Sequence, residues 1–209
     1  MIICCHSEIT RQWDDQELAD KLTLLPPDLQ QAALRKRQWL DKQLTIAGKI
    51  LLTEVLKNLG SKLALTHLKY NTHKRPYFGG AIDFNISHSG TRVICCGTDK
   101  GKIGVDIEQI KTISLSDYPD YFTKNEWDYI NGHKDKLAGF CNLWTRKEAV
   151  LKAIGTGFHT PLSSVDVVAN SIEYDNIAYH IQPLYIAPGY PCHIASTVKD
   201  GVKLMTIEL

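Results

Sequence analysis

The sequence predicts an α+β protein built of two similar halves, and three observations support this fold class. Strand-like and helical stretches follow in the order strand, helices, strands, helices, strands, so the order nearly repeats along the chain. The segment TDKGKIGVDIE at 98–108 resembles VKDGVKLMTIE at 198–208 in its turn glycine and its closing Ile-Glu. With 209 residues, of which 44% are hydrophobic, the chain can bury one large core or two small ones.

The first half of the chain predicts a strand, a helical region and further strands. Residues 1–5 are apolar and predict a short buried strand. Residues 25–60 open with Pro-Pro and carry apolar residues at helical spacing, which predicts two helices or one long helix with a break near Gly48. Beyond them we expect a strand at 63–70, a turn-rich connection at 71–80, and two strands around a turn within 92–110.

The second half predicts helices followed by strands. Residues 117–158 have a mainly helical pattern, and the last helix is expected to stop at Gly155 and Gly157. Strands are then expected at 163–169, 178–186, 190–198 and 202–209. We place the two halves at 1–108 and 109–209. Two halves of this kind leave a cleft between them, where ligand sites tend to lie.

Composition excludes several classes of protein. Lys and Arg number 24 against 23 Asp and Glu, so no global basic field predicts binding to nucleic acid or to an anionic membrane. The N-terminus lacks the apolar region of a signal peptide, and no apolar run approaches the ~20 residues that span a bilayer. We therefore expect a cytoplasmic protein. The six cysteines include two adjacent pairs, which predicts small buried hydrophobes rather than a disulfide or a zinc site.

Asp106 and Glu108 lie in the strand-like stretch KIGVDIEQ. Alternate residues of a strand share a face, so these two carboxylates point the same way, ~7 Å apart along the backbone. Hard oxygen ligands at this spacing can converge on Mg²⁺ or Mn²⁺. A half-exposed strand with a solvated acidic face explains the same pattern, and the motif alone leaves both interpretations open.

The stretch LWTRKEAVLKAIGTGF predicts a largely buried helix that carries charges. Glu148 and Lys152 have i,i+4 spacing at the border of a broad apolar stripe. Such a pair is often an ordinary surface ion pair, but charges on a buried helix need a partner or a ligand. Lys147 falls within the stripe itself, so it should meet an acid or reach out to solvent.

The stretch FNISHSG places Ser87 and His88 after an apolar run. A histidine here is often only a satisfied structural residue. Combined with three carboxylates and a lysine, however, these side chains are suited to holding a metal-bound pyrophosphate, because lysine and imidazolium neutralise phosphate oxygens. No P-loop and no G-x-G-x-x-G is present to bind a nucleotide instead.

The blocks FNISHSG, IGVDIE and WTRKEAVLKAIGTGF, in this order, resemble the signature blocks of the 4′-phosphopantetheinyl transferases. Their separation is similar to that in the surfactin-synthetase-activating type, a monomer of two similar α+β halves with helices on small, mostly antiparallel sheets. The resemblance runs from about Leu25 to the final strands. It implies that the phosphopantetheine arm of coenzyme A is moved to a serine of an acyl or peptidyl carrier protein, with 3′,5′-ADP as the other product.

The resemblance also implies roles for single residues. Magnesium ligands are matched by Asp106, Glu108 and Glu148, and Glu148 also matches the base for the incoming serine. Lys152 matches the catalytic lysine beside the pyrophosphate. Contacts to coenzyme A are matched by Ser87, His88, Thr45 and Arg75. The family often has basic residues near 28–37, where this chain has Leu29 and Ala32, so Arg35, Lys36 and Arg37 are candidates to replace them.

Two other classes of function remain open at this point. A magnesium-dependent pyrophosphate hydrolase could use the same carboxylates with water as the nucleophile, and a catalytically silent carrier-binding protein could keep the fold without turnover. The expected partners are coenzyme A and a carrier protein. A candidate docking surface for the carrier is formed by Leu115, Tyr118 and Tyr121, whereas Phe122 is expected in the core.

Overall fold

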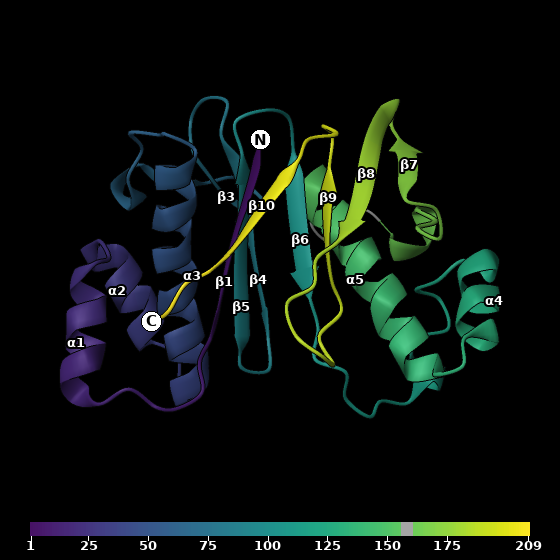
Figure 1. Cartoon of the computed structure of the whole chain (residues 1–209), viewed down its shortest axis with the longest axis horizontal. Helices are drawn as coiled ribbons and strands as arrows, with labels where there is room; N and C mark the ends of the chain where they lie inside the picture. The colour runs from purple at the N-terminus through teal and green to yellow at the C-terminus, as the bar shows by residue number, and fades with distance from the viewer. Residues whose placement is uncertain (156–160) are drawn as a thin grey trace.

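The computed structural model describes residues 1–155 and 161–209, and it places two four-stranded sheets between two sets of helices (Figure 1). The α+β class with two helix-covered sheets is therefore confirmed. The expected helix stop at Gly157 lies outside the described residues. No helix in the described part of the chain is long and apolar enough to cross a membrane.

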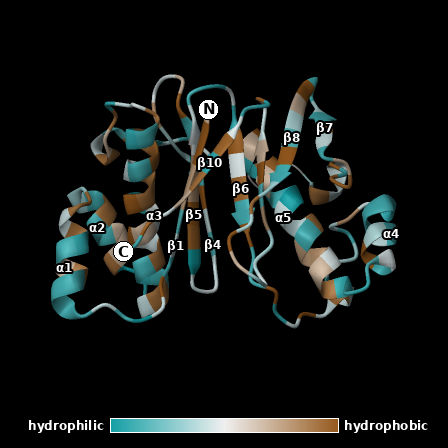
Figure 2. Cartoon of the chain, viewed as in Figure 1, coloured by the Kyte–Doolittle hydropathy of each residue, from teal (hydrophilic) through white to brown (hydrophobic). Residues whose placement is uncertain are grey.

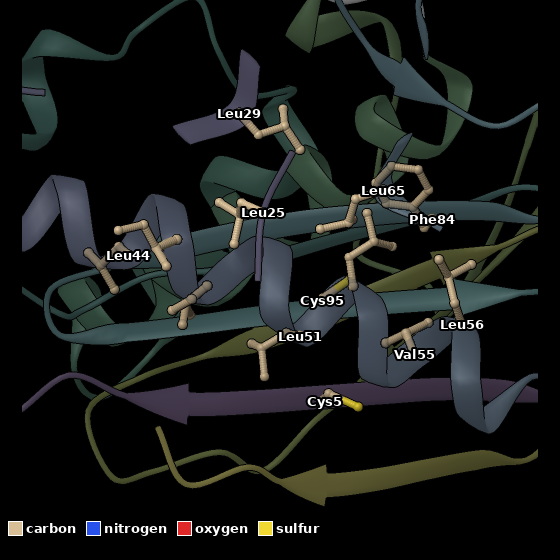
Figure 3. Close-up of a cluster of buried hydrophobic side chains, with 14 of the residues drawn as sticks. Cys5, Leu25, Leu29, Leu44, Leu51, Val55, Leu56, Leu65, Phe84 and Cys95 are labelled. Carbon is tan, nitrogen blue, oxygen red and sulfur yellow. The ribbon is translucent and has the colours of Figure 1, made fainter. Parts of the chain in front are cut away.

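The first sheet has the strand order β10-β1-β5-β4. Its strands are β1 (Ile2–Glu8), β4 (Asp83–Ser89), β5 (Arg92–Thr98) and β10 (Val202–Thr206). The helices of this half are α1 (Asp15–Thr23), α2 (Pro27–Leu34) and α3 (Trp39–Asn58). Helix α3 packs on β1 and β5, and Figure 3 shows its leucines and Val55 with Cys5 and Cys95 in the resulting core.

The second sheet has the order β6-β9-β8-β7. Its strands are β6 (Ile103–Ile107), β7 (Ser171–Tyr174), β8 (Ile177–Pro183) and β9 (Cys192–Ser196). Helix α5 (Lys136–Ile154) packs on β6 and β9, and α4 (Lys124–Gly132) packs on α5. Short elements complete the fold: η1 (Leu65–His67), β2 (Lys69–Tyr70), β3 (Pro76–Tyr77), η2 (Leu115–Asp117) and η4 (Leu162–Ser164).

The two sheets face each other across a third apolar core. Residues from β1 and β5 meet residues from β6 and β9 there, among them Ile2, Ile94, Ile103, Val105 and Ile194. Figure 2 shows the central strands as hydrophobic and the outer helix α1 as largely hydrophilic, the distribution expected when apolar side chains leave water. The protein is thus layered as helices, sheet, sheet, helices (Figure 1).

Each half of the chain gives its last strand to the sheet of the other half. Strand β6 leaves β5 and pairs with β9, while β10 leaves β9 and pairs in parallel with β1. The two connections touch, because Lys102 N donates to Thr197 Oγ1 at 2.8 Å and Thr197 N donates to the carbonyl of Lys102 at 3.1 Å. The two strands expected within 92–110 therefore exist, but they belong to different sheets and form no hairpin. The expected boundary at 108 therefore does not separate the two sheets, since β6 lies before it in the second sheet and β10 lies after it in the first.

Three local expectations differ from the structure. Helix α3 continues through Gly48, where a Cβ would lie 3.0 Å from Ile86, so this glycine allows close packing on the sheet rather than a break. Only Lys69–Tyr70 of the stretch expected as a strand at 63–70 pairs as a strand, and it follows the 3₁₀ turn η1. The stretch 163–169 forms no strand, because its carbonyl groups accept hydrogen bonds from side chains of α5 instead.

The cysteines lie in the cores, as the sequence analysis predicted. All six are buried and carry free thiols. Cys4 and Cys5 lie opposite Cys96 and Cys95 on neighbouring strands. Burial raises the pKa of the Cys5 thiol to about 12, so this thiol is protonated and unreactive near neutral pH.

Candidate active site

A cavity of about 320 Å³ lies where β4, β6 and α5 meet. Its lining residues are Ile86, Ser87, His88, Asp106, Glu108, Trp144, Glu148 and Lys152. The three sequence blocks singled out above thus contribute to one cavity between the two halves of the fold. Most of its lining side chains are polar or charged.

The close approach of β6 to α5 depends on Gly104. A Cβ at this position would overlap the carbonyl oxygen of Ala149 and the backbone nitrogen of Ala153, so only glycine fits. Gly104 and Asp106 share a face of the strand because side chains alternate. The glycine therefore lets the strand carry Asp106 against the helix that bears Glu148 and Lys152.

Asp106 is the most buried acid of the cavity, with 3% of the residue exposed. Lys152 Nζ donates to its Oδ1 at 2.6 Å, and Ser87 Oγ donates to the same oxygen at 2.9 Å. Lys152 also donates to Ser87 Oγ at 3.1 Å. The other oxygen, Oδ2, is buried and has no hydrogen-bond partner among the described residues. A buried carboxylate oxygen without a partner is costly, and a bound cation would satisfy it.

Burial raises the pKa of all three carboxyl groups above their usual values. For Asp106 and Glu108 this desolvation is opposed by hydrogen bonds and by the charge of Lys152. For Glu148 it is opposed by Lys152 and reinforced by the charges of the other two acids. Lys152 is thus the cation that acts on all three acids.

The donor set fits a hard divalent cation, since it consists of carboxylate oxygens with one oxygen left without a partner. Within residues 1–155 and 161–209, no three His, Cys, Asp or Glu side chains are already arranged as a metal site. The three acids therefore line a common cavity without converging on one point. Asp106, Glu108 and Glu148 are the residues that could hold such a cation.

His88 lies at the solvent-accessible rim of the cavity. Partial desolvation of its ring lowers its pKa. Asp41 on α3 counteracts this effect, whereas the charges of Lys152 and Lys36 add to it. The structure thus puts Lys36, from the segment between α2 and α3, within electrostatic range of the histidine.

Two of the expected coenzyme contacts do not line this cavity. Thr45 lies on α3, one turn after Asp41, and its hydroxyl donates to the carbonyl of that residue at 2.7 Å. Arg75 lines a separate cavity of about 630 Å³. Its guanidinium is paired with Asp83 at 2.9 Å and donates to the carbonyl of Ile103 at 3.1 Å.

Lys147 meets an acid, as its place in the apolar stripe predicted. It pairs with Glu126 of α4 at 2.8 Å, and both side chains are fully buried. Its Nζ also donates to the carbonyls of Leu162 and Val165, at 2.8 and 2.5 Å. The neighbouring Arg146 donates to the carbonyls of Val167, Val168 and Ala169. These bonds fix α5 against the segment after residue 160, and so fix the helix that carries Glu148.

An aromatic cluster adjoins the cavity at Trp144, one turn before Glu148. Trp144 contacts Tyr118, Tyr121 and Phe140, with ring centroids 5.7, 5.9 and 5.8 Å away. Tyr121 is 38% exposed, whereas Phe122 is buried as expected. The contact between Trp144 and the exposed Tyr121 thus links the cavity to the protein surface.

Sequence reasoning missed two residues that belong to this site. Trp144 lies in the apolar stripe of the helix and received no role, although its i,i+4 spacing to Glu148 places both on one face. Ser89 was passed over, although it shares a strand face with Ser87. Its hydroxyl donates to Glu108 Oε2 at 2.6 Å.

A cavity that gathers three carboxylates, a lysine and a histidine between two α+β halves has the donor set of enzymes that act on metal-bound phosphates. The family model of the 4′-phosphopantetheinyl transferase superfamily matches residues 102–196. The chain is 30% identical over 191 residues to the 4′-phosphopantetheinyl transferase gsp of Aneurinibacillus migulanus, covering 86% of this chain and 79% of that protein.

Two other relatives agree with this match. The 4′-phosphopantetheinyl transferase Sfp of Bacillus subtilis (strain 168) is 29% identical over 199 residues, covering 89% of this chain and 88% of Sfp. The 4′-phosphopantetheinyl transferase AcpT of Salmonella typhimurium is 31% identical over 158 residues, 72% of each chain. The chain belongs to the 4′-phosphopantetheinyl transferase superfamily. It is an enzyme that transfers the phosphopantetheine group of coenzyme A to carrier proteins.

Proposed function

We propose that the cavity between β4, β6 and α5 is the catalytic centre of this transfer. The observation that supports it best is that Ser87, His88, Asp106, Glu108, Glu148 and Lys152 line one cavity. In this proposal Asp106, Glu108 and Glu148 bind Mg²⁺, with Mn²⁺ as a substitute. The bound cation would neutralise charge on the pyrophosphate of coenzyme A.

The cationic side chains of the site bind the phosphate groups. Lys152 is anchored on Asp106 and Ser87, so its ammonium group is held at the floor of the cavity, where it can also meet a pyrophosphate oxygen. Ser87 contributes its hydroxyl there, and His88 contacts a phosphate at the rim. Lys36 replaces the basic residues that this chain lacks at Leu29 and Ala32, a role supported by its electrostatic influence on His88.

Thr45 and Arg75 stay predictions as coenzyme contacts. Thr45 and Asp41 both lie on α3. The charge of Asp41 acts on His88, so this part of α3 lies near the rim of the cavity, where the ligand would bind. The support for Arg75 is weaker, because its guanidinium is already paired with Asp83.

The carrier serine is the nucleophile of the proposed reaction. Its hydroxyl oxygen attacks the phosphorus that carries the pantetheine arm, and the bond from that phosphorus to the bridging oxygen breaks, releasing 3′,5′-ADP. Glu148 accepts the hydroxyl proton, directly or through a water molecule. Lys152 and His88 offset the charge that develops on the phosphate oxygens.

The carrier is an acyl or peptidyl carrier protein that docks beside Trp144. Tyr121 is exposed and contacts Trp144, as does the half-buried Tyr118, so a carrier seated beside Tyr121 presents its serine to the adjoining cavity. Action as a monomer stays a prediction from the resemblance. The cytoplasmic location stays a prediction from the sequence.

One assay tests the proposal against its rivals. Protein, Mg²⁺ and coenzyme A are incubated with an apo carrier protein, and the carrier is weighed by mass spectrometry. We expect the carrier to gain the phosphopantetheine mass, and a chelator to abolish the gain. Cleavage of coenzyme A without any change in the carrier would instead show a pyrophosphate hydrolase. If neither coenzyme A nor the carrier changes, with acyl and with peptidyl carriers alike, the protein would be a catalytically silent carrier-binding protein.

A further inference from the structure

Two edge strands meet beside the cavity without belonging to one sheet. Strand β4 ends the first sheet and β6 ends the second. The backbone amides on the free edge of β6 would lack partners, but side chains of β4 supply them. Ile103 N donates to Asp83 Oδ2 at 2.9 Å, and Val105 N donates to Asn85 Oδ1 at 3.3 Å.

The same side-chain series continues into the two acids of the D-x-E motif. Two residues beyond Asn85, Ser87 Oγ donates to Asp106 Oδ1 at 2.9 Å. Two residues further, Ser89 Oγ donates to Glu108 Oε2 at 2.6 Å. Alternate residues of β4 therefore hold the carboxylates of both Asp106 and Glu108. Serine suits these places because one hydroxyl can donate and accept at once.

Ser89 is the residue that fixes Glu108. The acid follows Ile107, the last residue of β6, so the strand ladder does not hold its side chain. The Ser89 hydroxyl accepts a hydrogen bond from Gln109 N at 3.0 Å while it donates to the carboxylate. Gly90 follows in a left-handed conformation (φ 56°), and a Cβ there would meet the side-chain ends of Gln109 and Tyr190. The end of β4 is thus packed tightly against the segment that carries the acid.

We propose that Ser89 is a positioning residue that holds the carboxylate of Glu108 ready for the divalent cation. This inference rests on the proposed metal role of Glu108. A glutamate side chain that is already ordered loses less conformational entropy when it binds a cation. Groups that orient a metal ligand in this way typically contribute ten- to a hundredfold to metal affinity.

The experiment measures Mn²⁺ binding directly, from the free Mn²⁺ signal in electron paramagnetic resonance, with and without coenzyme A. We expect Ser89→Ala to raise the dissociation constant for Mn²⁺ by roughly tenfold. Turnover by this variant should recover at saturating metal, since the hydroxyl contacts neither substrate in this proposal. Ser89→Thr keeps the hydroxyl and should bind Mn²⁺ like the wild type. Ser89→Cys keeps the shape with a weak donor, and should bind it more weakly.

Thr91 provides the matched control. It lies at the same end of the sheet, and its hydroxyl donates to Glu8 Oε1 at 3.1 Å, away from the acids of the cavity. Thr91→Ala should leave Mn²⁺ affinity and turnover unchanged. In a double-mutant cycle, adding Ser89→Ala to Glu108→Gln should cost no further metal affinity, because the group it positions is already gone.

Two results would overturn the inference, and they differ in what else they affect. Folded Ser89→Ala and Ser89→Cys variants with wild-type Mn²⁺ affinity, even with a lowered melting temperature, would leave the serine with a structural role only. If Glu108→Gln also binds Mn²⁺ like the wild type, then the metal role of Glu108 fails first, and with it that part of the proposed function.

Discussion

At the scale of single residues, the two oxygens of Asp106 have different environments. Oδ1 accepts hydrogen bonds from Lys152 and Ser87, while Oδ2 has no partner among the described residues. The first oxygen fixes the orientation of the carboxylate, and the second remains available. The sequence could predict that Asp106 and Glu108 share a strand face, because that follows from alternation. It could not predict that only one of the two oxygens is hydrogen-bonded, because the donors are 19 and 46 positions away in the chain.

The metal site is tested by removing charge without changing shape. Asp106→Asn and Glu108→Gln should each lower kcat/KM by well over tenfold, because charge stabilisation by the metal amounts to several kcal/mol. Activity of the wild type should vanish with a chelator and return with Mg²⁺ or Mn²⁺. Steady-state kinetics at limiting metal measures both effects. Full activity of either variant under these conditions would remove that carboxylate from the site.

Coenzyme binding should take up a proton at His88. The pKa of the free ring is lowered below its usual 6.5, so the ring is mostly neutral at pH 7. A phosphate beside it favours the protonated form, so affinity should fall as the pH rises above the pKa of the free ring. Calorimetry in two buffers of different ionisation enthalpy measures the uptake. His88→Ala should abolish it and weaken coenzyme use by roughly ten- to a hundredfold.

A control and a truncated substrate sharpen this test. His180→Ala, on β8, should change neither the proton uptake on binding nor the use of coenzyme A. Dephospho-coenzyme A lacks the 3′-phosphate, so a variant that loses affinity only for full coenzyme A has lost a contact to that phosphate. Arg75→Ala is tested in the same way. Equal losses on both substrates would favour a structural role for the Arg75–Asp83 pair.

At the scale of elements, the spacing of apolar residues correctly predicted those helices and contacts that depend on the local sequence. The helical pattern up to Gly155 is confirmed by α5, and the buried Lys147 meets Glu126 because an unpaired cation in that stripe would be too costly. The strand expected at 163–169 is absent, since Arg146 and Lys147 occupy its carbonyls. Helix α1 was missed, although its Asp14–Glu17 capping box was readable. Tertiary contacts thus decided the elements that sequence patterns alone described wrongly.

The contact between β6 and α5 should tolerate no side chain at position 104. Gly104→Ala places a Cβ onto the backbone of Ala149 and Ala153, which must push the helix away. We expect a loss of about 1–3 kcal/mol in the free energy of unfolding, together with a fall in kcat, as Lys152 and Glu148 move from Asp106. Urea unfolding and kinetics measure the two effects. Gly201→Ala is the control, because nothing lies within 4 Å of its Cβ. A stable, fully active Gly104→Ala enzyme would contradict this account.

At the scale of the whole molecule, the exchange of strands explains how two halves form one site. β6 carries Asp106 into the second sheet but remains beside β4, whose side chains bond to it. The site therefore combines a strand from each sheet with a helix of the second half. A near-repeat at 98–108 and 198–208 indicated duplication, and both segments prove to contain the crossing strands. The sequence could not predict which sheet each of these strands joins, because pairing between strands far apart in the chain leaves no local pattern.

The proposed carrier surface is tested by separating the two substrates. Leu115→Ala and Tyr121→Ala should raise KM for the carrier while KM for coenzyme A stays nearly unchanged, because these side chains lie outside the cavity. Phe122→Ala should instead destabilise the fold, since that ring is buried. Equal changes in both KM values would contradict the docking role.

The parallel pairing of β1 with β10 has a consequence for protein synthesis. Residues 2–6 are translated before β4 and β5, and their partners at 202–206 are translated after both of these strands. Until then the backbone N–H and C=O groups on one edge of β1 have no strand partner. The hydrogen bonds of this edge can therefore form only once translation has passed residues 202–206.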